Sequence, residues 1–381
     1  MTSDSLLYIT IIIISTYFAF LSQRVVSFQG KNGAIVQKKV NYIGFYIISF
    51  LILAFFSCSI ANGIDKDAYR FLFRENTISN IYEGVEPGFW LFIVVVKIFT
   101  SNENVFLGIV SFLTVFFTFN GVWKCRDKLS VGFAIFIYAS QYYLQSFNLM
   151  RMYLSMSILV LGSRNILDCK PKMFLLYILA ASSIHFSALF VLVGYLMSFV
   201  LVQRKKKVND LFFIFLIIAS IVVSILTVGI AAQFAEFDFS GKYSTYLSET
   251  TTGTVGFKVI LNIFPYFLVM YLCRLYNGNK WLISTSEGFC VAVLFISIMS
   301  YSVPVFGRSI SQFSIYIIIL LPTCLYMYRK GKLDNVRWKN KKDKYYIICF
   351  VLFLYFTLLL FLYLRDYMEL DGIDNCKFIW Q

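Results

Sequence analysis

The chain contains one histidine, His185, which lies inside the apolar stretch ILAASSIHFSALFVLVGYL. Histidine is the only side chain whose unperturbed pKa falls between about pH 5 and 8, so any imidazole acid–base chemistry must take place here. A single histidine also excludes a metal site built from several imidazoles. Two interpretations stay open: a ring that packs between helices and hydrogen-bonds Ser183 or Ser187, or a functional group that faces a cavity or a partner at membrane depth.

Arg151 is the second candidate, because the segment QYYLQSFNLMRMYLSMSILV around it contains no acidic residue. An arginine in an apolar helix is costly unless it meets a counter-charge or a water-filled cavity. Its planar guanidinium suits diphosphate oxygens, so Arg151 could bind an anionic substrate or pair with an acid from a loop.

Arg308 follows Pro304 and Gly307, which interrupt the helical pattern. It could be a second phosphate ligand or an anchor at the lipid headgroups.

Carboxylates gather in residues 61–88, which carry five acidic and three basic side chains. Asp65 and Asp67 come directly after a predicted span, and Glu86 precedes a Pro-Gly pair. Such acids could hold a divalent cation or act as a general base toward a sugar hydroxyl. The alternative is a solvated loop in which the acids pair locally with arginines such as Arg70.

Tyrosines accompany polar residues in the segment KYSTYLSE, which contains Tyr243 and Tyr246. Aromatic faces pack on the C–H surfaces of sugars, so this segment is suited to carbohydrate binding. Tyrosine is also enriched at membrane–water interfaces. Because aromatic residues make up 19% of the chain, both interpretations stay open.

The elements that must position these residues are membrane helices. The 381 residues are 59% hydrophobic and 14% charged, with a mean hydropathy of +0.74, whereas soluble domains carry about 25% charged residues. We expect an all-α polytopic membrane protein, one domain over residues 1–381, with about 10 to 13 membrane helices that include short or re-entrant ones. The predicted spans are roughly residues 5–22, 42–60, 104–122, 131–147, 150–166, 209–231, 259–275, 282–302, 312–328 and 345–364.

The net charge of +14 comes from three short segments, residues 23–41, 203–208 and 329–344. Basic residues in short loops mark the cytoplasmic side, so this charge indicates topology and not nucleic-acid binding. Residues 61–88, 232–258 and 303–312 and the acidic C-terminal tail are then expected outside. The N-terminal segment lacks the basic region of a cleavable signal peptide, and we expect it to remain as the first span.

Two segments do not fit simple spans, because residues 87–100 are short and residues 173–202 are too long for one upright helix. Basic residues favour the cytoplasmic side for both 123–129 and 164–172. Residues 173–202 would then enter and leave on one side as a hairpin, with His185 near its tip. The alternative is one long tilted helix that places 123–129 outside; we favour the hairpin.

Signatures of several other protein classes are missing from the sequence. The eight cysteines are scattered without a C-x-x-C pair, which predicts neither a disulfide framework nor a zinc site. There is no Walker A loop, no G-x-S-x-G and no H-E-x-x-H motif. Apart from Glu287, the interior of the predicted spans lacks acidic residues, which disfavours a proton-driven transporter. We expect no metal and no cofactor.

Taken together, these residues resemble the EpsG-like group of bacterial polysaccharide polymerases, the Wzy-type proteins. The resemblance covers most of residues 1–330. It is carried by an acid–Tyr–aromatic run, a Glu-x-Gly-aromatic motif, an Arg-led helix, an Ile-His-x-Ser motif and a later arginine. These residues are Asp65, Asp67, Tyr69 and Phe73; Glu86, Gly88 and Phe89; Arg151 through Leu161; Ile184, His185 and Ser187; and Arg308.

The resemblance implies a membrane glycosyltransferase, with a GT-C-like fold as one expectation, at the periplasmic or outer face of the bacterial inner membrane. Such an enzyme moves a growing O-antigen, capsule or exopolysaccharide chain from undecaprenyl diphosphate onto a new lipid-linked repeat. A flippase and a chain-length regulator of the same pathway would be its partners. We expect diphosphate binding by Arg151, Arg308 and Arg70, acceptor activation by His185 with Asp65, Asp67 or Glu86, and sugar contacts from Tyr69, Tyr243 and Tyr246.

Three other functions remain as alternatives at this point. A glycosyltransferase that uses a polyprenyl-monophosphate sugar would also use an external acid. An acyltransferase would use a histidine on the inner side, near a cytosolic acyl donor. A flippase or other transporter would be expected to show paired repeats and broken helices at the midplane.

Overall fold

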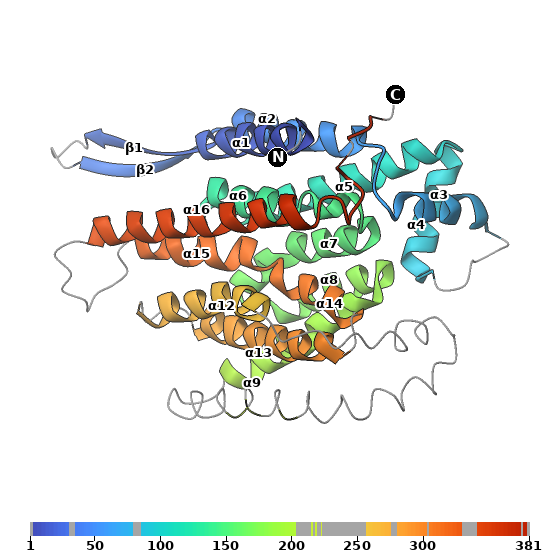
Figure 1. Ribbon diagram of the computed structural model, residues 1–381. Coiled ribbons are helices and arrows are strands. Elements are labelled where there is room, and N and C mark those ends of the chain that lie inside the picture. Colours follow the sequence, from blue (N-terminus) through green and yellow to red (C-terminus); the bar gives the residue numbers. More distant parts are fainter. Residues whose placement is uncertain are drawn as a thin grey trace.

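The computed structural model describes residues 3–29, 35–78, 85–202, 257–275, 280–302, 305–329, 341–374 and 376–378, with the single positions 215, 218 and 222. Most of the helices run along one common direction between two ends of the molecule (Figure 1). The predicted span 209–231, Tyr243 and Tyr246 lie outside the described residues, apart from those single positions.

The helices confirm the expected all-α polytopic class. Among the described residues, four helical stretches are long and apolar enough to cross a membrane: Asp4–Leu21, Glu103–Lys124, Ile310–Tyr328 and Tyr345–Asp366. They belong to α1 (Ser3–Leu21), α5 (Glu103–Lys124), α14 (Val305–Ser314) with α15 (Ile317–Arg329), and α16 (Lys341–Asp366). The other helices are α2 (Ile43–Ser59), α3 (Lys66–Glu75), α4 (Pro87–Phe99), α6 (Val131–Gln141), α7 (Met150–Leu167), α8 (Pro171–Ile184), α9 (Phe190–Val202), α12 (Phe257–Leu275) and α13 (Lys280–Ser302), with the short 3-10 helices η1 (Gln145–Phe147) and η2 (Phe186–Leu189).

Three predicted segments take a different form from the one expected. The basic segment 23–41, expected as a loop, contains two antiparallel strands, β1 (Gln23–Gln29) and β2 (Ile35–Asn41), which form a β-hairpin and whose β-branched residues favour strands. Residues 61–88, expected as an external loop, contain the amphipathic helix α3. The predicted span 131–147 ends at Gln141, and its remainder forms a turn and η1.

Residues 173–202 form the favoured hairpin. The helix breaks at His185, whose backbone is extended (φ −152°, ψ 117°), between α8 and η2. Phe174 near the start of α8 contacts Tyr195 of α9, with ring centroids 4.7 Å apart. Because these two residues lie almost equally far from His185 on either side, the chain must fold back on itself there. The prediction of a hairpin with His185 at its tip is confirmed.

The two ends of the bundle are chemically different. The β-hairpin lies at one end, which we call the basic end, and α3 and the C-terminal residues lie at the opposite end (Figure 1). The side chain of Gln23 joins the basic end to the α5–α6 turn, because it donates to Arg126 O and accepts from the Val131 backbone N–H. Segment 123–129 therefore lies at the end that carries the β-hairpin. Arg164 donates to Lys124 O at 3.0 Å, which brings segment 164–172 to the same end, as the charge of both segments predicts.

The core has two parts. The larger apolar cluster fills the bundle from α1 to α16. A smaller cluster at the opposite end is shared by α3, α4, α5, α7 and α8, and it contains Phe73, Phe89, Ile93, Val96, Phe106, Leu107, Val110, Met150, Leu154 and Ile184. This second cluster fixes the ends of three segments that carry candidate site residues.

Candidate functional site

Glu86, Arg151 and His185 meet at the opposite end of the bundle, although they lie far apart in the sequence. Glu86 is the residue before α4, where Pro87 begins the helix without needing a backbone N–H. Arg151 lies in the first turn of α7, and His185 lies at the break between α8 and η2. We call these three residues the Glu86 cluster.

Both carboxylate oxygens of Glu86 have partners. Oε2 lies 2.6 Å from Nη1 of Arg151, and Oε1 lies 3.3 Å from Nδ1 of His185. The backbone N–H of Phe186 also donates to Oε1 at 3.3 Å. The side chain of Glu86 is 6% exposed, that of Arg151 17% and that of His185 26%. The carboxylate is therefore the buried centre of the cluster, and the side chains of Arg151 and His185 are partly exposed.

The environment of Glu86 keeps it ionised. Burial on its own raises the pKa of a carboxyl, but the contact with His185 and the charge of Arg151 outweigh burial here. The pKa of Glu86 consequently lies below its usual value. An ionised, fully partnered carboxylate is a weak proton acceptor, so Glu86 is better suited to orienting the two bases than to removing a proton.

Aromatic residues also contact Arg151. Its guanidinium carbon lies 5.7 Å from the centroid of the Phe89 ring, within the range of a cation–π contact. The backbone N–H of Arg151 donates to the hydroxyl of Tyr69 at 3.4 Å, and the Tyr69 and Phe89 rings are 6.4 Å apart. Tyr69 thus belongs at the site, although the contact that the structure shows is to the backbone of Arg151.

A close helix contact brings Glu86 and His185 together. A Cβ atom on Gly88 would lie 2.3 Å from Oγ of Ser183 and 2.7 Å from its carbonyl oxygen. Only glycine therefore allows the start of α4 to approach the end of α8 this closely. Ser183 donates to Ala180 O and not to His185. Ser187, the other partner expected for a packing histidine, bonds instead to Gln312.

Gln312 of α14 is a residue that the sequence analysis missed. Its Nε2 donates to Oγ of Ser187 at 2.9 Å, and the residue is fully buried. Gln312 comes one helical turn after Arg308, and this spacing was the only signal in the sequence that could have found it. Arg308 also lies on α14, but its side chain is outside the described part of the chain.

The other two candidate acids of this segment, Asp65 and Asp67, make contacts with residues outside this cluster. Asp67 is 89% exposed and forms an ion pair with Arg70 at 2.6 Å. Arg70 also donates to Asn104 Oδ1 and to Ala61 O. Asp65 donates its backbone N–H to Asn148 Oδ1. Within the described residues, no three His, Cys, Asp or Glu side chains gather so that they could hold a metal ion.

A second ionic cluster occupies the other end of α7. Arg164 pairs with Asp127 and, at 2.9 Å, with Asp168. Lys128 lies 2.5 Å from Asp168. Two acids and two bases therefore balance one another at the basic end, and we call these residues the Arg164 cluster.

Comparison with known protein families gives a match. The model of the EpsG family matches residues 43–370, which include all three residues of the Glu86 cluster. No curated protein and no solved structure matches the chain. The match covers most of the sequence and agrees with the membrane helices described above. The chain therefore belongs to the EpsG family, a family of Wzy-like polysaccharide polymerases and glycosyltransferases.

Proposed function

We propose that this protein is a membrane glycosyltransferase that polymerises oligosaccharide repeats carried on undecaprenyl diphosphate. The observation that supports this most directly is the Glu86 cluster, in which one buried carboxylate holds an arginine and the only histidine side by side. Family membership supports a polysaccharide polymerase type of function in a membrane. The cluster supplies what the transfer needs, which is a cation for the leaving group and a base for the acceptor.

Arg151 would bind the diphosphate of the donor. A guanidinium forms parallel hydrogen bonds to phosphate oxygens, and Glu86 engages Nη1 from the buried side. The leaving diphosphate needs charge stabilisation in place of a general acid. Arg308, one turn before Gln312 on the neighbouring α14, remains our proposal for a second diphosphate ligand.

His185 would take the proton of the acceptor hydroxyl. Its Nδ1 faces Glu86, which leaves Nε2 for the acceptor. The hydroxyl oxygen bonds to the anomeric carbon of the donor while the bond from that carbon to the diphosphate oxygen breaks. The proton passes to Nε2, and the bonding electrons leave on the diphosphate. Protonated His185 and Arg151 then face one carboxylate, and the added positive charge favours the anionic leaving group.

The placement of the cluster supports a reaction at the outer face of the bacterial inner membrane. The Glu86 cluster lies at the end of α7 away from the Arg164 cluster and the β-hairpin. Basic segments mark the cytoplasmic side. Nucleotide sugars are absent outside the cytoplasm, so a lipid-linked donor is the suitable substrate there. A flippase would deliver the repeats, and a length regulator would act on the product.

The test is polysaccharide gel analysis of a deletion strain complemented with wild-type or variant protein at matched expression. We expect the deletion to lose long chains while a single-repeat product remains, because repeats still form and cross the membrane. Arg151→Ala and His185→Ala should give the same pattern. Arg74→Ala is the matched control, since Arg74 is an exposed arginine that pairs with Glu103.

Two results would contradict the proposal. Loss of the single-repeat product as well would place the protein at an earlier step or identify it as a flippase. Normal long chains from both variants would show that the Glu86 cluster is not the catalytic site.

A further inference from the structure

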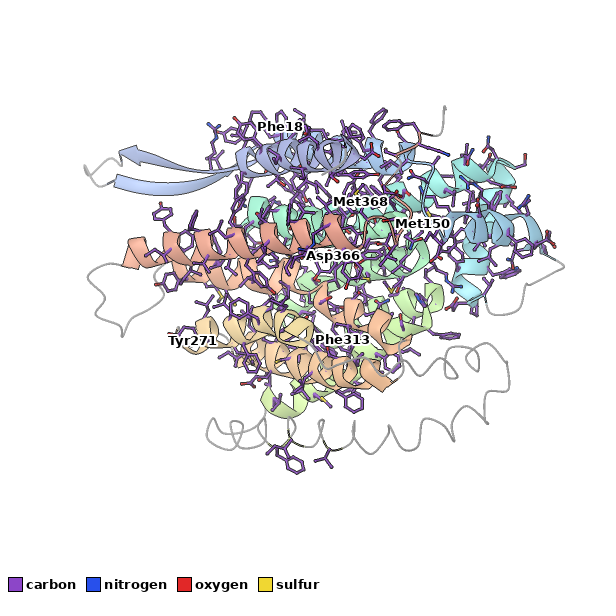
Figure 2. The ribbon with its side chains drawn as sticks, viewed as in Figure 1. Phe18, Met150, Tyr271, Phe313, Asp366 and Met368 are labelled. Carbon is purple, nitrogen blue, oxygen red and sulfur yellow. The ribbon has the colours of Figure 1, made fainter. Side chains whose placement is uncertain are left out.

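The C-terminal segment, of which residues 367–374 and 376–378 are described, is tied to the opposite end of the bundle. Ala61 donates its backbone N–H to Lys377 O at 2.8 Å, and Ile64 donates to Asp371 O at 3.2 Å. Tyr8 donates its hydroxyl to Ile373 O at 3.1 Å. Met368 of this segment and Met150 at the start of α7 lie in the same part of the molecule in Figure 2.

Asp371 is the residue through which this segment reaches α7. Its Oδ1 accepts a hydrogen bond from Nδ2 of Asn148 at 3.2 Å, and its Oδ2 accepts one from the hydroxyl of Tyr363. Asn148 is 7% exposed, and its Oδ1 accepts the backbone N–H of Asp65 at 2.8 Å. Both polar atoms of this buried amide are therefore used, which fixes its orientation.

Asn148 lies where α7 begins. Its carbonyl accepts the N–H of Met150 at 3.0 Å, and Arg151 follows in the same turn. One residue of α3 also holds this turn, since Tyr69 accepts the backbone N–H of Arg151. The start of α3 is in turn fixed by the bond from Asp65 to Asn148. Two links, at Asn148 and at Tyr69, thus join α3 to the first turn of α7.

We propose that Asn148 and Asp371 are positioning residues for Arg151, so that the C-terminal segment is part of the diphosphate-binding machinery. This inference rests on the proposed function. A guanidinium that must meet two phosphate oxygens loses affinity when it is displaced by a fraction of an ångström to one ångström. The Glu86 contact fixes the tip of the Arg151 side chain, and the Asn148–Asp371 pair fixes the backbone from which it extends.

The pair offers a reciprocal exchange as a test. In Asn148→Asp, two carboxylates face each other and the donor to Asp371 is lost. In the double variant Asn148→Asp/Asp371→Asn, the new amide at position 371 can donate to the new carboxylate at 148. The carboxylate can still accept the N–H of Asp65, and the amide oxygen can still accept the Tyr363 hydroxyl. Tyr8→Phe is the matched control, because it removes a bond to the same C-terminal segment that does not involve Asn148.

The measurement is the Kd of undecaprenyl diphosphate for the full-length protein in lipid nanodiscs, with the thermal midpoint recorded for each variant. We expect Asn148→Asp to weaken binding about tenfold, the change that corresponds to one lost charge-assisted hydrogen bond. The double variant should return to within about twofold of wild type. Tyr8→Phe should lower the thermal midpoint while its Kd stays within about twofold.

The outcomes separate this inference from the proposed function. If wild-type protein binds and Asn148→Asp binds equally well, the positioning role is wrong and the proposed function stands. If Asn148→Asp does not fold, the double variant is measured in its place. A folded double variant that binds undecaprenyl diphosphate more weakly than wild type also overturns the inference. If wild-type protein does not bind undecaprenyl diphosphate, the proposed function fails, and the inference fails with it.

Discussion

The two ionic clusters on α7 differ in burial and in the segments that form them, and we propose that only one of them is a functional site. The Arg164 cluster is balanced, and its members come from two turns at the basic end; Asp127 is 57% exposed. The Glu86 cluster has a buried carboxylate at its centre, comes from three separate segments and places an arginine and a histidine against that one carboxylate. In our proposal the Glu86 cluster also binds the diphosphate of the donor, whereas the Arg164 cluster has no role in the reaction. The two clusters therefore differ in the burial and the origin of their members, and not in the presence of arginine.

The strongest test of this difference is Glu86→Gln. Removal of one partner from a buried ion pair costs about 3–5 kcal/mol, because the remaining charge is left without compensation. We expect unfolding in detergent to become easier by about that amount and long-chain polysaccharide to be lost. A wild-type chain-length pattern on gels would show that the carboxylate does not organise Arg151 and His185.

Gly88→Ala tests the helix contact that assembles the Glu86 cluster. The new methyl group would overlap Ser183, and such overpacking costs about 1–3 kcal/mol. We expect a shift of α4 against α8 that reduces polymer yield more than it reduces expression. Gly44→Ala is the matched control, because a Cβ there meets nothing within 4 Å. Equal effects of the two variants would contradict this explanation.

Lys66 is a buried basic residue at the same end of the bundle as the Glu86 cluster, and its Nζ donates to Ile60 O. It therefore offers a further comparison between buried charges. Burial, followed by the charge of Arg70, lowers the pKa of Lys66 to about 7. Between this pKa and the usual value for lysine, the unfolded chain holds the proton and the folded chain does not. The free energy of unfolding should therefore rise as the pH rises through this window and level off below it.

Lys66→Met should remove that pH dependence and, at pH 7, stabilise the protein by about 1–2 kcal/mol. Thermal unfolding in detergent from pH 6 to 10 measures both effects. If the free energy of unfolding of the variant still rises with pH over this range, a group other than Lys66 causes the rise. Glu86 should not contribute to this slope. Its pKa lies below its usual value, so it changes the free energy of unfolding only at acid pH.

The smallest effect is expected from Asp168→Asn in the Arg164 cluster. Partly exposed ion pairs contribute about 0–1 kcal/mol, and Arg164 keeps Asp127 as a partner. We expect polymer length to stay unchanged and the thermal midpoint to fall only slightly. A loss of polymer comparable with that of Glu86→Gln would remove the distinction between the two clusters.

Much of the fold could be predicted because charge and hydropathy act locally along the chain. The basic segments indicated which turns share an end, and the length of residues 173–202 indicated a hairpin at His185. The strands of residues 23–41 were not foreseen. A short basic segment between two spans fits a loop or a hairpin equally well, and pairing of its two halves decides between them.

The site could be predicted only as a set of candidates. Sequence identified Arg151 and His185 as costly residues that need partners, and it offered Asp65, Asp67 and Glu86 as acids. Which acid meets them depends on the contact between Gly88 and Ser183, which lie on helices that are distant in sequence. The Asn148–Asp371 bond joins residues separated by 223 positions, and no local pattern encodes it.

The pairing of Phe378 with Ile60 has a practical consequence for fusion proteins. A reporter domain or purification tag attached after Gln381 would tend to displace a segment that is hydrogen-bonded to the residues just before α3. We expect such fusions to lower polymer yield even when they insert in the correct orientation, and a long flexible spacer should restore it. If a long spacer restores the activity that a C-terminal fusion has lost, the loss arises because the segment is displaced from Ile60 and not because the membrane topology is reversed.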